Sequence, residues 1–531
     1  MNSFSFFLLL SLQCLTSGPV KQANQLQIPE SRYIVQIADE RYDDFVEQLA
    51  DMSFTLTRLH PGADLYRFRL QANADIDLGK MLTSGIINGW QHDRPVIPRN
   101  TPDDPLFPEQ WDMMRIGMEE AWDQTTGGVT INGDTIVVAI LDTGYDLDHE
   151  DLSTNYWHNS GEIPGDLIDN DQNGYVDDYL GLNIQTGDDM HEADLHGTAV
   201  AGIIGAVGGN GKGVAGVNWH VKLLLISGIR NESDIIEGYM YIKELRETYN
   251  GSGGSEGAFV VVANLSVGID NAFPADHMMW CNQYEAMGSA GILGVCATTN
   301  TNSDVDMFGD MPTTCPSNFM ISVTNTGKDD NKLMFAGFGK THIDLGAPGT
   351  PTLTTELANG YKDFIGTSAA APHVAGSVAL LYAIACHDIA DLATTEPDIV
   401  ALQMRNLVLD FTQPVSALMP LTVSGGRLSV KNAVDAVDML CGNTGGELGI
   451  VEITPNPFTE FGTVVYRIPT ISAHEVLIYD SAGRLLRKEH PKAVIPGLQT
   501  FTITNSSFPP GVYHFTVRQG GSQVTRSFMI F

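Results

Sequence analysis

The sequence predicts a three-part protein whose largest part is an α/β domain, with a parallel sheet covered by helices on both faces. Between residues 105 and 445, short apolar runs rich in β-branched residues alternate with longer helical stretches, which is typical of such a sheet. Residues 25–100 predict a small α+β unit before it, and residues 448–531 predict an all-β sandwich after it. A chain of 531 residues with 43% hydrophobic residues is long enough for several cores.

The first 18 residues have the pattern of an export signal. The apolar run 4–10 is followed by small residues at 16–18, and the segment is too short to span a bilayer. Because no Lys or Arg precedes the apolar run, a buried N-terminal strand is the alternative. No later stretch approaches about 20 consecutive apolar residues, so we expect no transmembrane segment.

The unit at residues 25–100 is predicted to contain two strands and one helix. Residues 32–37 and 65–70 alternate in hydrophobicity as strands do, and residues 41–51 form an amphipathic helix. The polar, proline-rich segment 99–105 follows, with the composition of an exposed junction between domains.

Five apolar runs are predicted to be buried strands of the parallel sheet: 135–141, 221–226, 259–263, 291–297 and 320–324. Asp142, Asn264 and Asn300 each follow such a run directly or within three residues. Ligands of open α/β sheets bind beyond the carboxyl ends of the strands. We therefore expect these three side chains at one functional edge of the sheet.

The tail is predicted to be a separate domain. The glycine-containing segment 443–446 has the composition of a hinge. After it, residues 475–480, 511–517 and 525–531 alternate as strands and are separated by turn residues. A sandwich of roughly 80 residues is within the size range of an independent domain.

The charge of the chain excludes a nucleic-acid-binding role. The formal net charge is -35 at pH 7, so phosphate backbones would be repelled. Residues 448–531 differ from the rest, since they carry five acidic and seven basic side chains.

The six cysteines become five if Cys14 leaves with the signal, which predicts one thiol that is either free or bonded to another molecule. Cys296 is the candidate because it lies in an apolar run. The other four are expected to form disulfides in an oxidising compartment, in the pairs Cys281–Cys315 and Cys386–Cys441.

Asp142, His196 and Ser368 occur in segments that suit nucleophilic catalysis. The carboxylate of Asp142, at a strand end, can hold an imidazole, and His196 is a natural general base. Ser368 begins an alanine-rich helix whose free N–H groups can face an oxyanion, and Pro372 is expected near its first turn. Taken singly, each has an ordinary explanation: a turn-forming Asp, an unremarkable His and an N-cap Ser.

Together these segments resemble the subtilisin-like serine proteases over roughly residues 105–440, where the chain order is also Asp, His, Ser. The resemblance implies that Ser368 is the nucleophile, His196 the general base and Asp142 the residue that orients His196. It also implies that Asn300 is the side-chain donor of the oxyanion hole.

The same resemblance implies where an extended substrate binds. Residues 264–268 match the strand that pairs with the substrate backbone. The expected substrate-binding residues are Ser266, Val267, Gly268, Ala297, Thr298 and Thr299. Thr299 departs from the family pattern, in which Gly is common there, so the pocket before the scissile bond is expected to be reshaped. Ala199 and Ala369 also depart from the pattern, outside the triad.

An acidic segment resembles the first half of an EF-hand-type calcium loop, with oxygen ligands at alternate positions and Gly174 at the turn. The expected ligands are Asp169, Asp171, Asn173, Tyr175, Asp177 and Asp178. Position twelve is Leu180, so a ligand from elsewhere, Asp177 or Asp178, or water must complete the shell. The alternative is a solvated acidic loop.

The tail resembles the type-A C-terminal sorting domains of type IX secretion, through segments 454–458, 478–484 and 511–513. The alternative is a β-module that binds or stabilises. Residues 25–100 loosely resemble subtilase propeptides, which implies an inhibitor-chaperone role.

The sequence therefore predicts a secreted or surface-attached, calcium-dependent serine endopeptidase made as a precursor. We expect it to be a monomer whose partners are protein or peptide substrates and the type IX secretion machinery. A catalytically silent surface adhesin with the same fold is the rival hypothesis. An α/β-hydrolase is excluded because its order is Ser, acid, His, and Ala370 stands where its nucleophile motif needs Gly.

Overall fold

The computed structural model describes residues 31–50, 52–70, 76, 78–93, 101–442, 447–454, 456–458, 461–469, 474–489, 497–504 and 508–531. The predicted export signal, residues 1–18, and the predicted hinge, residues 443–446, lie outside these ranges. Backbone contacts divide the chain into two units, Met1–Pro98 and Arg99–Phe531.

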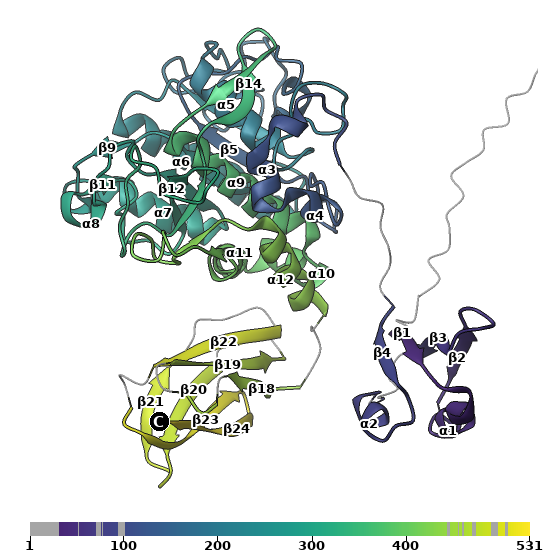
Figure 1. Ribbon diagram of the computed structural model, residues 1–531. Helices are drawn as coiled ribbons and strands as arrows, with labels where there is room; N and C mark the ends of the chain where they lie inside the picture. The colour runs from purple at the N-terminus through teal and green to yellow at the C-terminus, as the bar shows by residue number, and fades with distance from the viewer. Residues whose placement is uncertain are drawn as a thin grey trace, which may run out of the picture. The chain divides into compact units, whose positions relative to one another are not determined.

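The first unit is an antiparallel sheet with two short helices (Figure 1). Its strands run in the order β2-β3-β1-β4, and its elements are β1 (Ser31–Gln36), η1 (Asp39–Arg41), α1 (Tyr42–Glu47), β2 (Phe54–Arg58), β3 (Leu65–Leu70), α2 (Leu78–Thr83) and β4 (Gly89–His92). The helix predicted over residues 41–51 is shorter, because the backbone beyond Glu47 continues in tight turns such as Leu49 N–H to Val46 O, 3.1 Å.

The second unit contains the predicted parallel sheet. Nine strands lie in the order β16-β17-β13-β12-β10-β8-β5-β7-β6, and only the edge pair β16–β17 is antiparallel. They are β5 (Val137–Leu141), β6 (Gly181–Asn183), β7 (Lys222–Ser227), β8 (Val260–Leu265), β10 (Leu293–Ala297), β12 (Met320–Thr326), β13 (Leu345–Pro348), β16 (Gln413–Pro414) and β17 (Gly426–Arg427). The α/β fold class is therefore confirmed, and the five predicted strands correspond to β5, β7, β8, β10 and β12.

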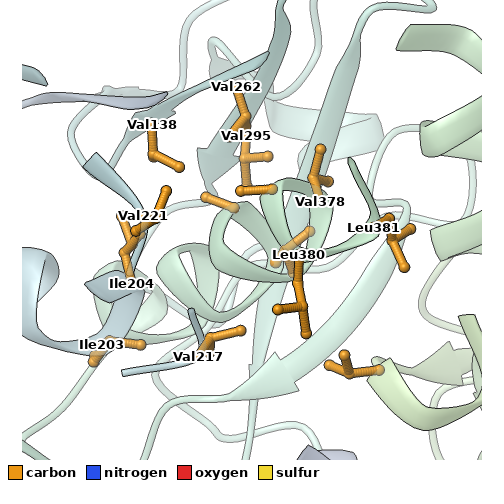
Figure 2. Close-up of a cluster of buried hydrophobic side chains, with 14 of the residues drawn as sticks. Val138, Ile203, Ile204, Val217, Val221, Val262, Val295, Val378, Leu380 and Leu381 are labelled. Atoms are coloured by element: carbon orange, nitrogen blue, oxygen red, sulfur yellow. The ribbon is translucent and has the colours of Figure 1, made fainter. Parts of the chain in front are cut away.

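Helices cover both faces of this sheet. They are α3 (Trp111–Ile116), α4 (Met118–Trp122), α5 (Leu195–Gly205), α6 (Glu232–Ser252), α7 (Met278–Ala290), α8 (Val305–Phe308), α9 (Thr367–Ile384), α10 (His387–Thr395), α11 (Pro397–Asp410) and α12 (Val430–Gly442). Alternate side chains of β5 enter two different cores, with Val138 on the α5 and α9 face and Ala139 on the α6 and α7 face. Figure 2 shows Val138, Val262 and Val295 of the sheet beside Val378 and Leu380 of α9.

One sequence prediction in this unit is corrected, and the position of Pro372 is now defined. Asn264 lies inside β8 rather than after it, because the strand continues to Leu265. Pro372 is the sixth residue of α9, beyond the first turn, and its missing N–H is compensated at the site described below. Among the described residues, α9 is also long and apolar enough to cross a membrane, but 89% of it is buried as the central helix of the domain.

Two strand pairs lie outside the main sheet. They are β9 (Ile269–Asp270) with β11 (Asp310–Met311), and β14 (Thr352–Glu356) with β15 (Gly360–Phe364), both antiparallel. Disulfides join Cys281 to Cys315 and Cys386 to Cys441, and Cys296 is a buried free thiol, as predicted.

The tail forms two antiparallel sheets, β18-β19-β22 and β21-β20-β23-β24 (Figure 1). The strands are β18 (Gly449–Thr454), β19 (Phe461–Ile468), β20 (His474–Asp480), β21 (Leu485–Glu489), β22 (Gly497–Thr504), β23 (Gly511–Gln519) and β24 (Ser522–Ile530). Both sheets contribute to one apolar core of their own, so the predicted sandwich is confirmed.

Candidate active site

The candidate site lies beyond the carboxyl ends of three neighbouring strands, β5, β8 and β10. Asp142 directly follows β5, Ser266 directly follows β8, and residues 298–300 directly follow β10. Since parallel strands end at the same edge of a sheet, this topology gathers segments that are more than 150 residues apart in the chain.

Asp142 and His196 form a hydrogen-bonded pair. His196 Nδ1 lies 2.8 and 2.9 Å from the two carboxylate oxygens of Asp142, whose side chain is fully buried. The N–H and hydroxyl of Thr143 also donate to Asp142 Oδ1, at 2.8 and 3.1 Å. Because an ionised carboxylate only accepts, Nδ1 carries the proton and Nε2 of the neutral ring is the basic nitrogen.

The surroundings of His196 keep it protonatable. Burial lowers the pKa of the imidazole, but the hydrogen bond and charge of Asp142, together with the charge of Asp194, outweigh burial and raise the pKa of His196 above its ordinary value. Asp194 also caps helix α5, since its carboxylate accepts the His196 N–H at 2.8 Å.

Close packing fixes the start of α5 against the end of β5. A Cβ on Gly197 would lie 2.2 Å from the Gly144 carbonyl and 3.0 Å from the Asp142 Cβ, so only glycine fits. Glycine after the histidine therefore allows the helix to bring His196 to Asp142.

Ser368 is the second residue of α9 and exchanges hydrogen bonds with Ser266. The Ser368 hydroxyl donates to the Ser266 carbonyl at 3.1 Å, and the Ser266 hydroxyl donates to the Ser368 carbonyl at 3.3 Å. In a regular helix the Ser368 carbonyl would accept from residue 372, but Pro372 has no N–H. The Ser266 hydroxyl thus occupies the acceptor that the proline leaves.

His196 lies against the strand that leads to Ser368. Its ring meets the ring of Phe364, the last residue of β15, edge-on with 5.4 Å between centroids. Among the hydrogen bonds of the described residues, none joins Ser368 Oγ to the imidazole, because the hydroxyl is engaged with the Ser266 carbonyl.

Asn300 is oriented by the helix start. Its Oδ1 accepts from the N–H of Thr367 at 2.9 Å and from the Thr367 hydroxyl at 3.1 Å, which leaves the amide Nδ2 as a donor. Gly366 allows this approach, with φ at +129° and a Cβ position only 2.9 Å from Asn300 Oδ1. Within the described part of the chain, the Ser368 N–H has no backbone partner, as expected at a helix N-terminus.

Ser368 and Asn300 line one cavity of about 220 Å³. The six residues predicted to bind substrate also line it: Ser266, Val267, Gly268, Ala297, Thr298 and Thr299. The sequence reasoning missed three further lining residues: Thr367, which precedes Ser368, and the acidic pair Asp270 and Asp310. The two acidic residues are the unexpected ones. Neither belongs to a motif, and the short pair β9–β11 that brings them together is too brief to give a periodic pattern.

The acidic loop brings three carboxylates together, two of them predicted. Ligand oxygens of Asp171, Asp178 and Glu162 all lie within 4.8 Å of one another. Asn173 lies beside them, with Nδ2 3.2 Å from Asp171 Oδ2 and 2.9 Å from Asp178 Oδ2. Burial raises the pKa of Asp178, and the charge of Asp171 adds to the shift.

The remaining predicted ligands have other partners in the structure. Asp169 and Asp177 each accept two backbone N–H bonds that fold the loop, at 3.0 to 3.1 Å. The Tyr175 N–H donates to Asn173 Oδ1 at 2.8 Å. These residues shape the loop around the carboxylate cluster.

Glu162 fits the ligand that the loop sequence lacks. Its side chain is buried, Oε1 accepts from the N–H groups of Asn170 and Asp171, and Oε2 has no hydrogen-bond partner among the described residues. The three carboxylate oxygens lie close enough together to share one calcium ion, whose ligand distances are about 2.4 Å. Sequence reasoning missed Glu162 because it precedes the loop motif instead of closing it.

A second buried carboxylate pair, Asp104 and Asp151, was also missed. Burial raises the pKa of Asp151 to about 6, and the charge of Asp104 adds to the shift. Asp151 accepts from Asn210 Nδ2 at 2.7 Å and from the Val214 N–H at 3.0 Å. Asp104 Oδ1 is buried without a partner in the described structure.

Comparison with known families assigns the central part of the chain. Residues 133–422, more than half of the chain, match the Subtilase family. The chain belongs to the subtilase family. Residues 452–531 match the family described as Secretion system C-terminal sorting domain, which confirms the resemblance predicted for the tail. The subtilase is therefore secreted or attached to the cell surface.

The subtilase is similar to several named proteases. An extracellular protease of Xanthomonas campestris is 30% identical over 310 residues, covering 54% of this chain and 50% of that protein. Subtilisin-like protease 1 of Plasmodium berghei is 26% identical over 348 residues, covering 61% and 53%. A solved protease of Pseudoalteromonas arctica aligns with a TM-score of 0.46 and 26% identity, over 64% of this chain and 100% of that one. The subtilase spans about half the length of the curated relatives it matches.

Proposed function

We propose that this subtilase is a secreted serine endopeptidase that hydrolyses peptide bonds through an acyl-enzyme. The single observation that carries the proposal is the Asp142–His196 hydrogen bond, which leaves Nε2 as a base at the edge of the sheet where Ser368 lies. Membership of the subtilase family and the extracellular protease among its relatives support the same activity.

The first half of the reaction makes the acyl-enzyme. Ser368 Oγ bonds to the scissile carbonyl carbon while His196 Nε2 takes its proton, and Asp142 stabilises the imidazolium. The developing oxyanion accepts from Asn300 Nδ2 and the Ser368 N–H, and a donor of this kind contributes about 3 kcal/mol. The C–N bond then breaks as His196 returns the proton to the leaving amine.

Water completes the cycle. Its oxygen bonds to the acyl carbon while His196 takes one of its protons, and the proton returns to Ser368 Oγ as the acyl bond breaks. A free carboxyl group and the resting hydroxyl are the products.

Labelling with a fluorophosphonate probe tests this function. The secreted protein is expected to react covalently at Ser368, and Ser368→Ala to remain unlabelled. Ser377→Ala is the matched control, since Ser377 lies on the same helix with its hydroxyl bonded to the His373 carbonyl. Absence of labelling in the wild type would favour the silent adhesin instead.

We further propose that the carboxylates of Glu162, Asp171 and Asp178 hold a structural calcium ion, in a family where calcium binding is common. The orphaned Glu162 Oε2 supports this, since a buried carboxylate oxygen without a partner is costly. Calcium would supply the positive charge that three clustered carboxylates need to remain ionised.

The ends of the chain suggest a maturation route. We propose residues 25–100 as a propeptide and the tail as the part that engages the type IX secretion machinery. Mass spectrometry of the secreted protein is expected to find a mature N-terminus near residue 100 and loss of the sandwich. Recovery of residues 25–531 intact in an active enzyme would contradict the processing.

A further inference from the structure

The cavity beside Ser368 contains two carboxylates that the catalytic machinery does not use. Asp310 and Asp270 line it together with Ser368 and Asn300. If the proposed function is correct, a side chain of the substrate residue before the scissile bond enters this cavity, because the oxyanion donors and the substrate-pairing segment border it. The inference rests on that function.

Asp310 presents one oxygen to the cavity. Its side chain is only 2% exposed, and three donors converge on Oδ2: the Thr298 hydroxyl at 2.8 Å, the Thr299 N–H at 3.1 Å and the Thr313 hydroxyl. Among the described residues, none donates a hydrogen bond to Oδ1. The carboxylate is therefore held rigidly by one oxygen while the other is left for a ligand.

Asp270 lies directly opposite Asp310. The two residues are paired across the antiparallel strands β9 and β11, where facing side chains are close neighbours. Like charges in this position are destabilising, and no Lys, Arg or His is among the described residues that line the cavity. The pair accordingly favours a cation from outside the protein.

The charge state of Asp310 supports the binding of a cation. Burial raises the pKa of Asp310 to about 6, the three hydrogen bonds oppose the shift, and the charge of Asp270 adds to it. The carboxyl is therefore ionised at pH 8. One buried charged acceptor with a single free oxygen matches one ammonium or guanidinium group.

We propose that this cavity selects lysine or arginine at the substrate residue before the scissile bond, with Asp310 Oδ1 binding the cationic group and Asp270 at the rim. The long apolar stem of such a side chain suits the walls formed by Val267 and Ala297.

The test uses fluorogenic peptides that differ only at this residue, carrying Arg, Lys, Gln, Leu or Glu, at pH 8, with the enzyme concentration set by fluorophosphonate titration. The kcat/KM for Arg and Lys is expected to exceed that for the neutral analogue Gln by about 10- to 100-fold, as for hydrogen bonds to charged groups. Asp310→Asn is expected to lower the Arg-to-Leu ratio by a similar factor, and the exposed Asp270→Asn by about threefold. Asp276→Asn removes an exposed charge that does not line the cavity and should leave the ratio unchanged.

Three outcomes are separable. A wild type that cleaves Leu as well as Arg, or a ratio that neither variant changes, overturns the selection of basic residues while leaving the protease function intact. Absence of labelling and of hydrolysis of every peptide is the failure of the proposed function. Should Asp310→Asn fail to fold, competitive inhibition of the wild type by benzamidine but not by benzamide keeps the test decisive, and equal weakness of both inhibitors contradicts the proposal.

Discussion

The proposed catalytic cluster and the acidic loop are built in opposite ways. Asp142, His196 and Ser368 lie at the ends of β5, α5 and α9, elements of the buried sheet and its covering helices. Between η3 (Ser153–Asn155) and β6, the described structure of the acidic loop has neither helix nor strand, and side-chain oxygens hold its backbone.

The two sites are therefore ordered by different interactions. Packed apolar side chains position the catalytic groups before any ligand binds. In the loop, the carboxylates that organise the backbone also repel one another, so the calcium ion proposed above would stabilise the loop. Substitutions of the proposed catalytic residues should therefore change activity with little effect on stability. Removal of calcium should change the stability of the acidic loop.

The largest effect is expected for Asp142→Asn. The Thr143 N–H and hydroxyl would hold the amide oxygen of the asparagine at the Oδ1 position, so that its NH2 group faces His196 Nδ1 and favours the wrong tautomer. We therefore expect kcat to fall by about 10⁴-fold with little change in melting temperature. Steady-state kinetics with a peptide substrate and thermal unfolding measure the two quantities. Asp148→Asn, an exposed neighbour in the same loop, should keep both. A loss of activity under tenfold for Asp142→Asn would contradict the catalytic assignment.

Calcium removal is expected to give the next largest effect, in which stability falls while the reactivity of Ser368 is kept. A ligand at 100 times its Kd stabilises by about 2.7 kcal/mol, so chelation is expected to lower the melting temperature by about 5 °C, with calcium restoring it. Glu162→Gln should reduce this response, because it removes a ligand charge from the acidic loop. Fluorophosphonate labelling at 25 °C should continue in chelator. A melting curve that Glu162→Gln leaves fully calcium-responsive would exclude the loop as the calcium site.

The smallest effect concerns pH. In the proposed mechanism activity requires neutral His196, and since the pKa of His196 is raised, kcat/KM is expected to reach half its maximum above pH 6.5. Asp194→Asn removes one negative charge while an asparagine still caps α5. The imidazole pKa therefore falls, and the acidic limb of the profile of kcat/KM against pH moves to lower pH. A limb that moves to higher pH, or a wild-type midpoint below 6.5, would show that another group controls it.

The sequence predicted those features that have a local signal. Five sheet strands were recognised from apolar runs, whereas β6, β13, β16 and β17 have only two to four residues and no readable period. The residues at the strand ends were recognised because their motifs are continuous in sequence. Asp310 and Glu162 were missed, since each acts through neighbours that tertiary structure alone brings near: Asp270 across a two-residue strand, and Asp171 across a loop.

The hydrogen bonds between Ser266 and Ser368 hold the Ser368 hydroxyl away from the imidazole while no substrate is bound. In the proposed mechanism, Ser368 Oγ has to leave the Ser266 carbonyl before it can donate its proton to the imidazole of His196. A peptide aligned along residues 266–268 would disturb that same acceptor. Binding of the peptide substrate would then also release the Ser368 hydroxyl for deprotonation. Without substrate, the hydroxyl stays bonded to the Ser266 carbonyl.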